Sequence, residues 1–180
     1  MDTNQFSFTR LQNEILRLLC IKSGEQLNLR GIARELSVSP TAVAKSIKEL
    51  EKEELIKVDK SKTMNLIFVS LNNNSKTLKF KRVENLKIIY ESNFSDFLEN
   101  HFPNSSTVLY GDYSQGIDTS QSIVNIAIIG SKNKNLDLRE FEKKLERKIN
   151  LEFFNSFKEI NKELRQKILN GIVLAGELKL

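Results

Sequence analysis

Two apolar runs separated by a short polar insert constrain the fold of this chain more than any other feature. The runs occupy residues 108–110 and 123–129, and the insert contains Gly111 and Gly116 at turn positions. Short apolar runs bounded by glycine-containing turns are typical of buried strands. The sequence therefore predicts two adjacent strands joined by a polar segment.

The stretch VLYGDYSQGIDTSQSIVNIAII over these residues resembles the signature of the nucleotidyltransferase superfamily, the DNA polymerase β type, in its minimal form. In that family a strand ends in Gly-Ser, a short helix follows, and the next strand carries an Asp-x-Asp pair. The resemblance implies a small α/β domain with a mixed sheet at residues 104–180. The motif positions in this chain are Gly111, Asp112, Gly116, Ser122, Ile123 and Asn125.

The residues that would carry the family's chemistry do not occupy these positions. Ile123 and Asn125 stand where two aspartates hold divalent metals, and neither side chain supplies a carboxylate. Asp112 places a negative charge where the family's serine meets phosphate at a helix N-terminus. The nearest match to a third carboxylate is Glu152 or Asn150, and one carboxylate would not hold two metals. The resemblance therefore implies a fold that has lost catalysis, and we expect no metal and no cofactor.

An active nucleotidyltransferase acting on RNA, protein or a small molecule is the alternative interpretation. Asp112 and Asp118 would then replace the missing aspartate pair. They fall on the loop and helix between the two strands rather than on a common strand face, which is a poor geometry for sharing a metal.

Three capped helical patterns occupy the first third of the chain. Thr9 begins a capping-box pattern ahead of a helix expected at residues 10–21. Asn28 can cap a short second helix, and Ser39 can cap a third helix at residues 40–54 that begins with proline. The sequence predicts a three-helix unit.

The third helix has two opposite faces, followed by a predicted hairpin. One face is an apolar stripe of Val43, Ile47 and Leu50, and the other is a polar stripe of Thr41, Lys45, Lys48 and Lys52. Two segments of alternating polarity, residues 55–58 and 64–71, are expected to form strands joined by a basic loop.

This order of helices and strands resembles a winged helix-turn-helix domain of the MarR-like or ArsR-like kind. The stretch IARELSVSPTAVAKSIKELEKEELI at residues 32–56 carries the resemblance. It implies binding to double-stranded DNA, with the third helix in the major groove and the wing on the neighbouring backbone. For any single lysine, a solvated helix face is the alternative. The expected DNA contacts are Ser39, Thr41, Lys45, Lys48, Lys52, Lys60 and Lys62.

Positive charge is concentrated in the first half of the sequence. Residues 1–82 hold 15 Lys and Arg against 9 Asp and Glu, whereas residues 83–180 hold 13 against 14. The asymmetry favours a first half that meets a polyanion and a second half that does not.

A polar joint near residue 75 is the expected domain boundary. The winged helix domain is assigned to residues 1–75, and connecting helices to residues 76–103. Residues 76–82 could form a last wing strand or lead into the next helix. The apolar positions of the connecting helices fit either a homodimer interface or core packing against the second domain.

The rest of the second domain is expected to alternate helices and strands. A helix is predicted at residues 136–148, a strand at 149–154, a helix at 158–170 and a closing segment at 171–178. Three phenylalanines near the strand are interpreted as core, and the run of Lys and Glu at residues 132–148 is interpreted as a solvated helix face.

The remaining features point to a cytoplasmic protein. The first residues lack a basic-then-apolar signal pattern, and the apolar runs are far shorter than the roughly 20 residues that span a bilayer. Cys20 is the only cysteine, which fits a reducing compartment, and one cysteine with one histidine, His101, does not suggest a metal site. We expect an α+β protein that binds DNA as a homodimeric transcription regulator, with the second domain serving dimerisation or sensing.

Overall fold

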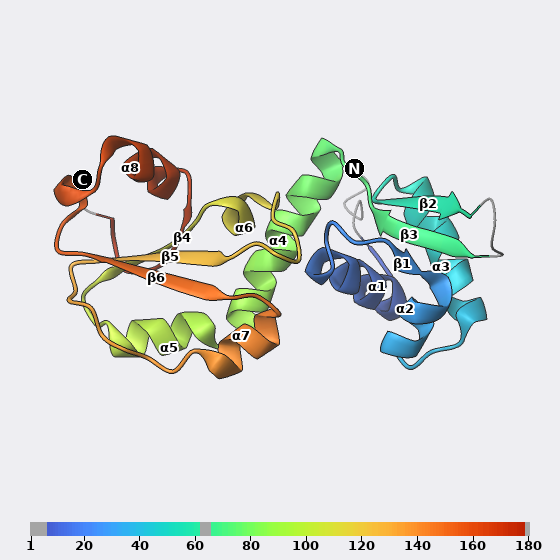
Figure 1. Cartoon of the computed structure of the whole chain (residues 1–180), viewed down its shortest axis with the longest axis horizontal. Coiled ribbons are helices and arrows are strands. Elements are labelled where there is room, and N and C mark those ends of the chain that lie inside the picture. Colours follow the sequence, from blue (N-terminus) through green and yellow to red (C-terminus); the bar gives the residue numbers. More distant parts are fainter. Residues whose placement is uncertain (1–6, 62–65, 179–180) are drawn as a thin grey trace. The chain divides into compact units, whose positions relative to one another are not determined.

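The chain folds into two compact units, Met1–Thr77 and Leu78–Leu180, in a computed structural model that describes residues 7–61 and 66–178 (Figure 1). Lys62, one of the expected wing contacts, lies outside the described residues. Each unit has its own sheet. None of the helices in the described ranges is long and apolar enough to cross a membrane.

The position of the boundary corrects the expected charge asymmetry. Lys79, Lys81 and Arg82 follow Thr77 and therefore belong to the second unit. The first unit then holds 12 Lys and Arg against 9 Asp and Glu, and the second holds 16 against 14. Both units are mildly basic, so net charge alone does not single out the first one as the polyanion-binding part.

The helices of the first unit begin where the caps predict. Thr9 accepts a hydrogen bond from the backbone of Gln12 at 3.3 Å, and the Gln12 side chain accepts one from the Thr9 backbone at 2.7 Å, which confirms the capping box. Asn28 and Ser39 cap the next two helices in the same manner. The helices are α1 (Arg10–Ile21), α2 (Leu29–Glu35) and α3 (Pro40–Lys52).

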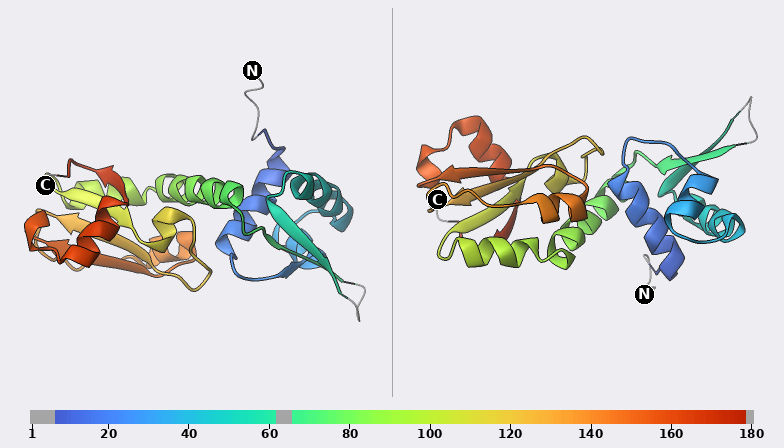
Figure 2. Two further views of the ribbon diagram at one scale, coloured as in Figure 1. Left: turned by 90° about the horizontal axis from the view of Figure 1, so that it is seen from above. Right: turned by 60° about the horizontal axis from the view of Figure 1, so that its bottom comes forward.

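Helix α3 ends two residues earlier than expected, because Glu54 adopts a left-handed φ of 58°. The three strands that complete the unit are β1 (Leu27–Asn28), β2 (Ile56–Lys60) and β3 (Ile67–Leu71). They form an antiparallel sheet in the order β1-β3-β2, and β2 with β3 runs out from the helices as a ribbon (Figure 2). Strand β1 was not predicted, because a strand of two residues is too short to show an alternation of apolar and polar side chains.

The boundary between the units falls within helix α4 (Ser75–Glu91), and α5 (Phe94–His101) follows in the second unit. Residues 76–82 are helical, so they lead into a helix and the alternative of a further wing strand is wrong. Four apolar side chains of these helices are buried, Ile88, Ile89, Phe94 and Leu98, whereas Val83 and Tyr90 of α4 are exposed. The buried residues pack in the core, and the exposed Val83 and Tyr90 leave the dimer alternative for α4 open.

A mixed four-stranded sheet forms the centre of the second unit, as the sequence predicts. The strands are β4 (Ser106–Tyr110), β5 (Val124–Ile129), β6 (Ile149–Phe154) and β7 (Ile172–Ala175), in the order β6-β5-β4-β7. Strand β4 is antiparallel to β5 and β7, whereas β5 and β6 are parallel. A four-residue helix, α6 (Asp112–Gln115), directly follows β4.

The two later helices are shorter than predicted. Helix α7 (Arg139–Leu145) ends where Glu146 takes a left-handed φ of 49°. The expected helix at residues 158–170 is split into a 3-10 turn, η1 (Phe157–Glu159), and α8 (Lys162–Leu169), because Ile160 is extended. Asn161 then caps α8 by accepting from the backbone of Leu164 at 2.9 Å.

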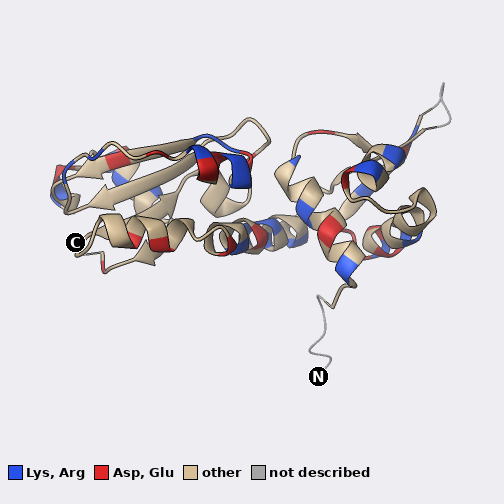
Figure 3. Cartoon of the chain, turned by 90° about the horizontal axis from the view of Figure 1, so that it is seen from below, with Lys and Arg blue, Asp and Glu red and all other residues tan. Residues whose placement is uncertain are grey.

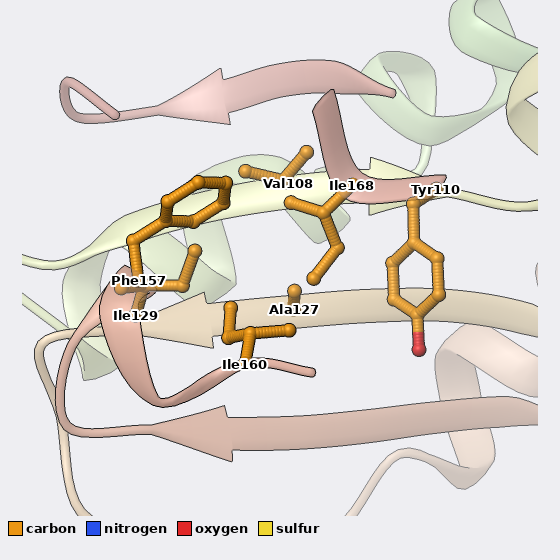
Figure 4. Close-up of a cluster of buried hydrophobic side chains, with 7 residues drawn as sticks. All are labelled: Val108, Tyr110, Ala127, Ile129, Phe157, Ile160 and Ile168. Carbon is orange, nitrogen blue, oxygen red and sulfur yellow. The ribbon is translucent and has the colours of Figure 1, made fainter. Parts of the chain in front are cut away.

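Helices cover both faces of this sheet, with α5 and α7 on one side and α8 on the other (Figure 1). On the α8 side, side chains from β4 and β5 meet side chains from the segment around α8 in a buried cluster (Figure 4). Phe157 belongs to this cluster and Phe154 packs against it, which confirms the core interpretation of these aromatics. The cluster consists of Val108, Tyr110, Ala127, Ile129, Phe157, Ile160 and Ile168.

Candidate nucleic-acid interface and polar sites

Helix α3 presents the two faces that its sequence predicts. The apolar stripe is buried, with Val43 and Leu50 at 0% exposure. The opposite stripe, Thr41, Lys45, Lys48 and Lys52, is exposed. Charged positions along both units are coloured in Figure 3. A helix with one face packed and the other carrying lysines has the form required to enter a DNA groove.

The charge on this exposed face changes along the helix. Lys52 pairs with Glu49 at 3.0 Å, and Glu51 is exposed in the same final turn. Within the described residues, Lys45 and Lys48 take part in no ion pair. The positive charge available to a polyanion therefore lies in the first and middle turns of α3 rather than at its end.

The remaining expected DNA contacts flank this face. The Ser39 hydroxyl accepts a hydrogen bond from the backbone of Ala42 at 3.2 Å as the cap of α3, and its own proton remains available to donate. Lys60 is exposed at the end of β2. Ser39 thus lies at the start of α3, and Thr41, Lys45 and Lys48 lie along its exposed face. Lys60 lies on the β2–β3 ribbon.

In the second unit, the sheet brings together a polar cluster on three neighbouring strands. Asn125 lies opposite Tyr110 on one side and Asn150 on the other. The Asn150 amide donates to Asn125 Oδ1 at 3.3 Å and to Glu152 Oε1 at 3.1 Å. Burial, and then a hydrogen bond to Glu152, raises the pKa of Tyr110 above its usual value. The cluster therefore contains one carboxylate, from Glu152, together with two amides and one neutral phenol.

The other motif positions are dispersed around this cluster. Ile123 precedes β5 and is 47% exposed, so it is not part of the strand face. The Ser122 hydroxyl accepts from the backbone of Thr119 at 2.9 Å within a turn. Gly116 has φ +75°, and a Cβ there would lie 2.6 Å from the Leu78 carbonyl oxygen, so only glycine fits. Asp112 is exposed at the start of α6 and, with Gly111, lines a polar pocket of about 580 Å³.

Asp118 has a different role from the one that the active-enzyme alternative requires. Its carboxylate is fully buried, with Oδ1 2.8 Å from Lys81 Nζ and 2.7 Å from the Asn85 amide nitrogen. Its other oxygen, Oδ2, accepts from Arg147 Nη2 at 3.2 Å. Both oxygens of the carboxylate are therefore engaged by protein donors. Among the residues that the structure describes, no group of three His, Cys, Asp or Glu could hold a metal ion.

Sequence reasoning missed this buried cluster. Lys81 and Asn85 lie four residues apart on the buried face of α4, which is largely polar, and that spacing was the available local signal. Arg147 belongs to the charged run at residues 132–148, and the interpretation of that run as solvated is wrong for this residue, which is only 5% exposed. Nothing in the linear pattern distinguishes it from its exposed neighbours.

Residues 11–63 match the family model of the MarR family. A MarR-family winged helix domain occupies these residues. The match includes α1 from its second residue, both helices of the helix-turn-helix motif, and β2. The exposed lysines of α3 and Lys60 therefore lie within the residues that the family model matches.

Several solved structures are similar to part of this chain. A variant of ZitR from Lactococcus lactis is 25% identical, with a TM-score of 0.42 over 57% of this chain and 66% of that one. Adhesin competence repressor (AdcR) from Streptococcus pyogenes is 22% identical, with a TM-score of 0.44 over 56% of this chain and 71% of that one. ZitR in complex with DNA is 26% identical, with a TM-score of 0.40 over 56% and 64%.

This chain thus spans about two thirds of the length of the solved structures that it matches. No curated protein matches it. The MarR-family domain is assigned from the family model, and its assignment covers the first unit only.

Proposed function

We propose that this protein is a transcription regulator that binds double-stranded DNA through its MarR-family domain. The observation that carries the proposal is the exposed face of α3, where Thr41, Lys45 and Lys48 lie opposite a fully packed face within that domain. In winged helix domains such a helix enters the major groove while the wing contacts the adjacent backbone.

The contacts divide into those that select sequence and those that only attract DNA. Ser39 and Thr41, at the start of α3, are suited to base edges or to phosphate, and Lys45 can reach either. Lys48 and the wing residues Lys60 and Lys62 are suited to phosphates, which add affinity without sequence preference. Lys52 contributes less than its neighbours, because its ammonium already pairs with Glu49.

Homodimer formation is part of the proposal. Two MarR-family domains related by a two-fold axis would place identical recognition helices on the half-sites of a palindromic DNA site. Static light scattering at tens of micromolar protein should give a mass near twice that of one 20.7 kDa chain. A mass of one chain would remove the dimer and leave DNA binding intact.

For the second unit, we propose a nucleotidyltransferase-like fold that performs no nucleotidyl transfer and serves the regulator as a dimerisation or sensing module. Support comes from the mixed sheet, from α6 directly after Gly111, and from the polar cluster of β4–β6, whose single carboxylate is bonded to neutral groups. Incubation with labelled nucleotides and magnesium or manganese should leave RNA, protein and the chain itself unlabelled.

The DNA proposal is tested by titrating labelled random duplex DNA at two salt concentrations. The double variant Lys45→Ala and Lys48→Ala should bind more weakly and with a shallower salt dependence, by about one unit of slope for each lost phosphate contact. The matched control is Lys132→Ala with Lys134→Ala, which removes two exposed lysines from the second unit. Equal affinity and slope in both double variants and the parent would refute the assignment of α3.

A further inference from the structure

A second pocket, of about 470 Å³, lies beside the C-terminal end of α7 in the second unit. One wall is the turn at residues 120–122, whose two serines and one glutamine offer hydroxyl and amide groups. The charged residues of the wall are Arg139, Glu142, Lys143, Glu146, Arg147 and Lys148. Four are cationic and two are acidic, so the wall carries a net positive charge.

The innermost charged residue of this pocket, Arg147, belongs to the buried cluster around Asp118. The side chains of Arg147 and Lys81 are each 2% exposed, and both pair with the same carboxylate. Two buried cations therefore share one buried anion. Removing an ion from water costs several kcal/mol unless opposite charge and hydrogen bonds replace the lost hydration. Among these three side chains, positive charge exceeds negative charge by one.

The hydrogen bonds of Arg147 show the same deficit. Nη1 donates to the Glu146 carbonyl at 3.0 Å and Nη2 donates to Asp118 at 3.2 Å. The third nitrogen, Nε, is buried and has no hydrogen-bond partner. A guanidinium is a planar fork of five donors that matches the oxygens of phosphate and carboxylate groups. This side chain is packed to more than nine tenths, lines the pocket, and is incompletely satisfied.

The other charged residues of the wall are satisfied to different degrees. Glu142 accepts from Lys148 at 2.9 Å and from the backbone of Ile149 at 3.1 Å, and these bonds lower its pKa. Arg139 pairs with Asp137 at 2.6 Å, outside the pocket wall. Lys143 takes part in no ion pair within the described part of the chain. Among those residues Lys143 therefore has no carboxylate partner, and Arg147 shares the carboxylate of Asp118 with Lys81.

We propose that this pocket binds a phosphate group, held between Arg147 and Lys143, with the hydroxyl groups of the 120–122 turn as further donors. A phosphate group carries close to two negative charges at neutral pH and three strong acceptor oxygens, which matches two cations better than a single carboxylate would. The volume lies within the range of ligand pockets and also admits a small organic group attached to the phosphate. The ligand is either free phosphate or a small phosphorylated compound.

This site is separate from the residues proposed to contact DNA, and of the six motif positions it includes only Ser122. It lies in the second unit, and none of the residues proposed to contact DNA lines it. The loss of either activity would therefore leave the other measurable. Phosphate binding would give the second unit a ligand of its own.

Calorimetric titration of the full chain at constant ionic strength tests the proposal, with inorganic phosphate in one arm and adenosine monophosphate in the other. Lys143→Ala should weaken binding of the tighter probe about tenfold, since it removes one charge-assisted contact. Lys144→Ala is the matched control, because it removes the next lysine of α7, which pairs with Glu140 at 2.7 Å and does not line the pocket. It should change the affinity less than about twofold.

Tighter binding of adenosine monophosphate would identify a phosphorylated compound as the ligand, and equal or weaker binding would identify free phosphate. A third variant, Arg147→Lys, keeps the charge but removes the fork, and should also weaken binding. If that variant fails to fold, the comparison of Lys143→Ala with Lys144→Ala still tests the proposal. The proposal is overturned if neither probe binds at about 10 mM, or if Lys143→Ala and Lys144→Ala weaken binding equally.

Discussion

The exposed lysines of α3 and the buried cations of the second unit use similar side chains in opposite environments. Lys45 and Lys48 stand in water, where their hydration is retained and their field reaches any approaching polyanion. Lys81 and Arg147 have lost their hydration and depend on the Asp118 carboxylate and on backbone carbonyls for compensation. Exposed cations therefore serve binding at little expense of stability, whereas buried cations make stability depend on every partner.

The strongest test of this contrast removes the shared anion. Asp118→Asn leaves Lys81 and Arg147 buried without a carboxylate, and we expect it to destabilise the second unit by about 3–5 kcal/mol. The chain has three tyrosines and no tryptophan, and Tyr90, Tyr110 and Tyr113 all lie in the second unit. Tyrosine fluorescence during urea unfolding therefore reports on this unit alone.

The matched control is Asp96→Asn, which changes an exposed carboxylate of α5 in the same unit. It should shift the urea midpoint far less. If both variants had the same small effect, the buried cluster would not carry the second unit's stability.

A smaller effect is expected when one of the two cations is removed instead. Lys81→Met leaves Asp118 with Arg147 and Asn85, so the carboxylate keeps a cation on Oδ2 and a donor on Oδ1. We expect a loss of about 1–2 kcal/mol, from the hydrogen bonds that the ammonium made. A loss as large as that of Asp118→Asn, measured by the same tyrosine signal, would mean that the cluster has no surplus cation and would weaken the argument for an anion in the adjoining pocket.

Most of the fold could be predicted from the sequence because local signals mark it. The caps at Thr9, Asn28 and Ser39 fix three helix starts, and the apolar runs around residues 108 and 123 fix two strands. The predicted helix ends were less accurate than the predicted starts. Glu54 and Glu146 end their helices in a left-handed conformation, and a glutamate does not indicate such an end in the sequence as a glycine would.

The candidate sites were predictable only in part. The exposed face of α3 follows from helical spacing within one element, so its residues could be named in advance. The cluster around Asp118 joins α4, the loop after Gly116 and Arg147. These three parts of the sequence lie more than 25 residues apart. Such long-range pairing depends on the order of the strands, which no local pattern contains.

The contrast between buried and exposed groups extends to the tyrosines at high pH. The pKa of Tyr110 is raised above its usual value by burial and by Glu152. A phenol with a raised folded-state pKa contributes stability that is fully present below its unfolded pKa of about 10 and is lost as the pH rises toward the folded value. We therefore expect the urea midpoint of the second unit to fall above about pH 10.

Tyr110→Phe should remove the part of this fall that Tyr110 causes, whereas Tyr90→Phe, at a position that is 47% exposed, should leave it. The measurement is the urea midpoint, followed by tyrosine fluorescence at several pH values. Identical pH profiles for the parent and Tyr110→Phe would show that the phenol of Tyr110 titrates normally and that the polar cluster of β4–β6 is open to water.

The smallest expected change in stability comes from the exposed side of the comparison. Lys45→Ala with Lys48→Ala removes two solvated cations that form no ion pair within the described residues, so the free energy of unfolding of the first unit should change by less than about 0.5 kcal/mol. Far-ultraviolet circular dichroism during urea unfolding follows the helices of both units, and the tyrosine signal follows the second unit alone, so a change in the first signal without a change in the second belongs to the first unit. Weaker DNA binding at unchanged stability would assign both lysines to the interface. A loss of more than about 1 kcal/mol would show instead that these side chains pack against the domain, and the weaker DNA binding of the variant would then be a consequence of unfolding.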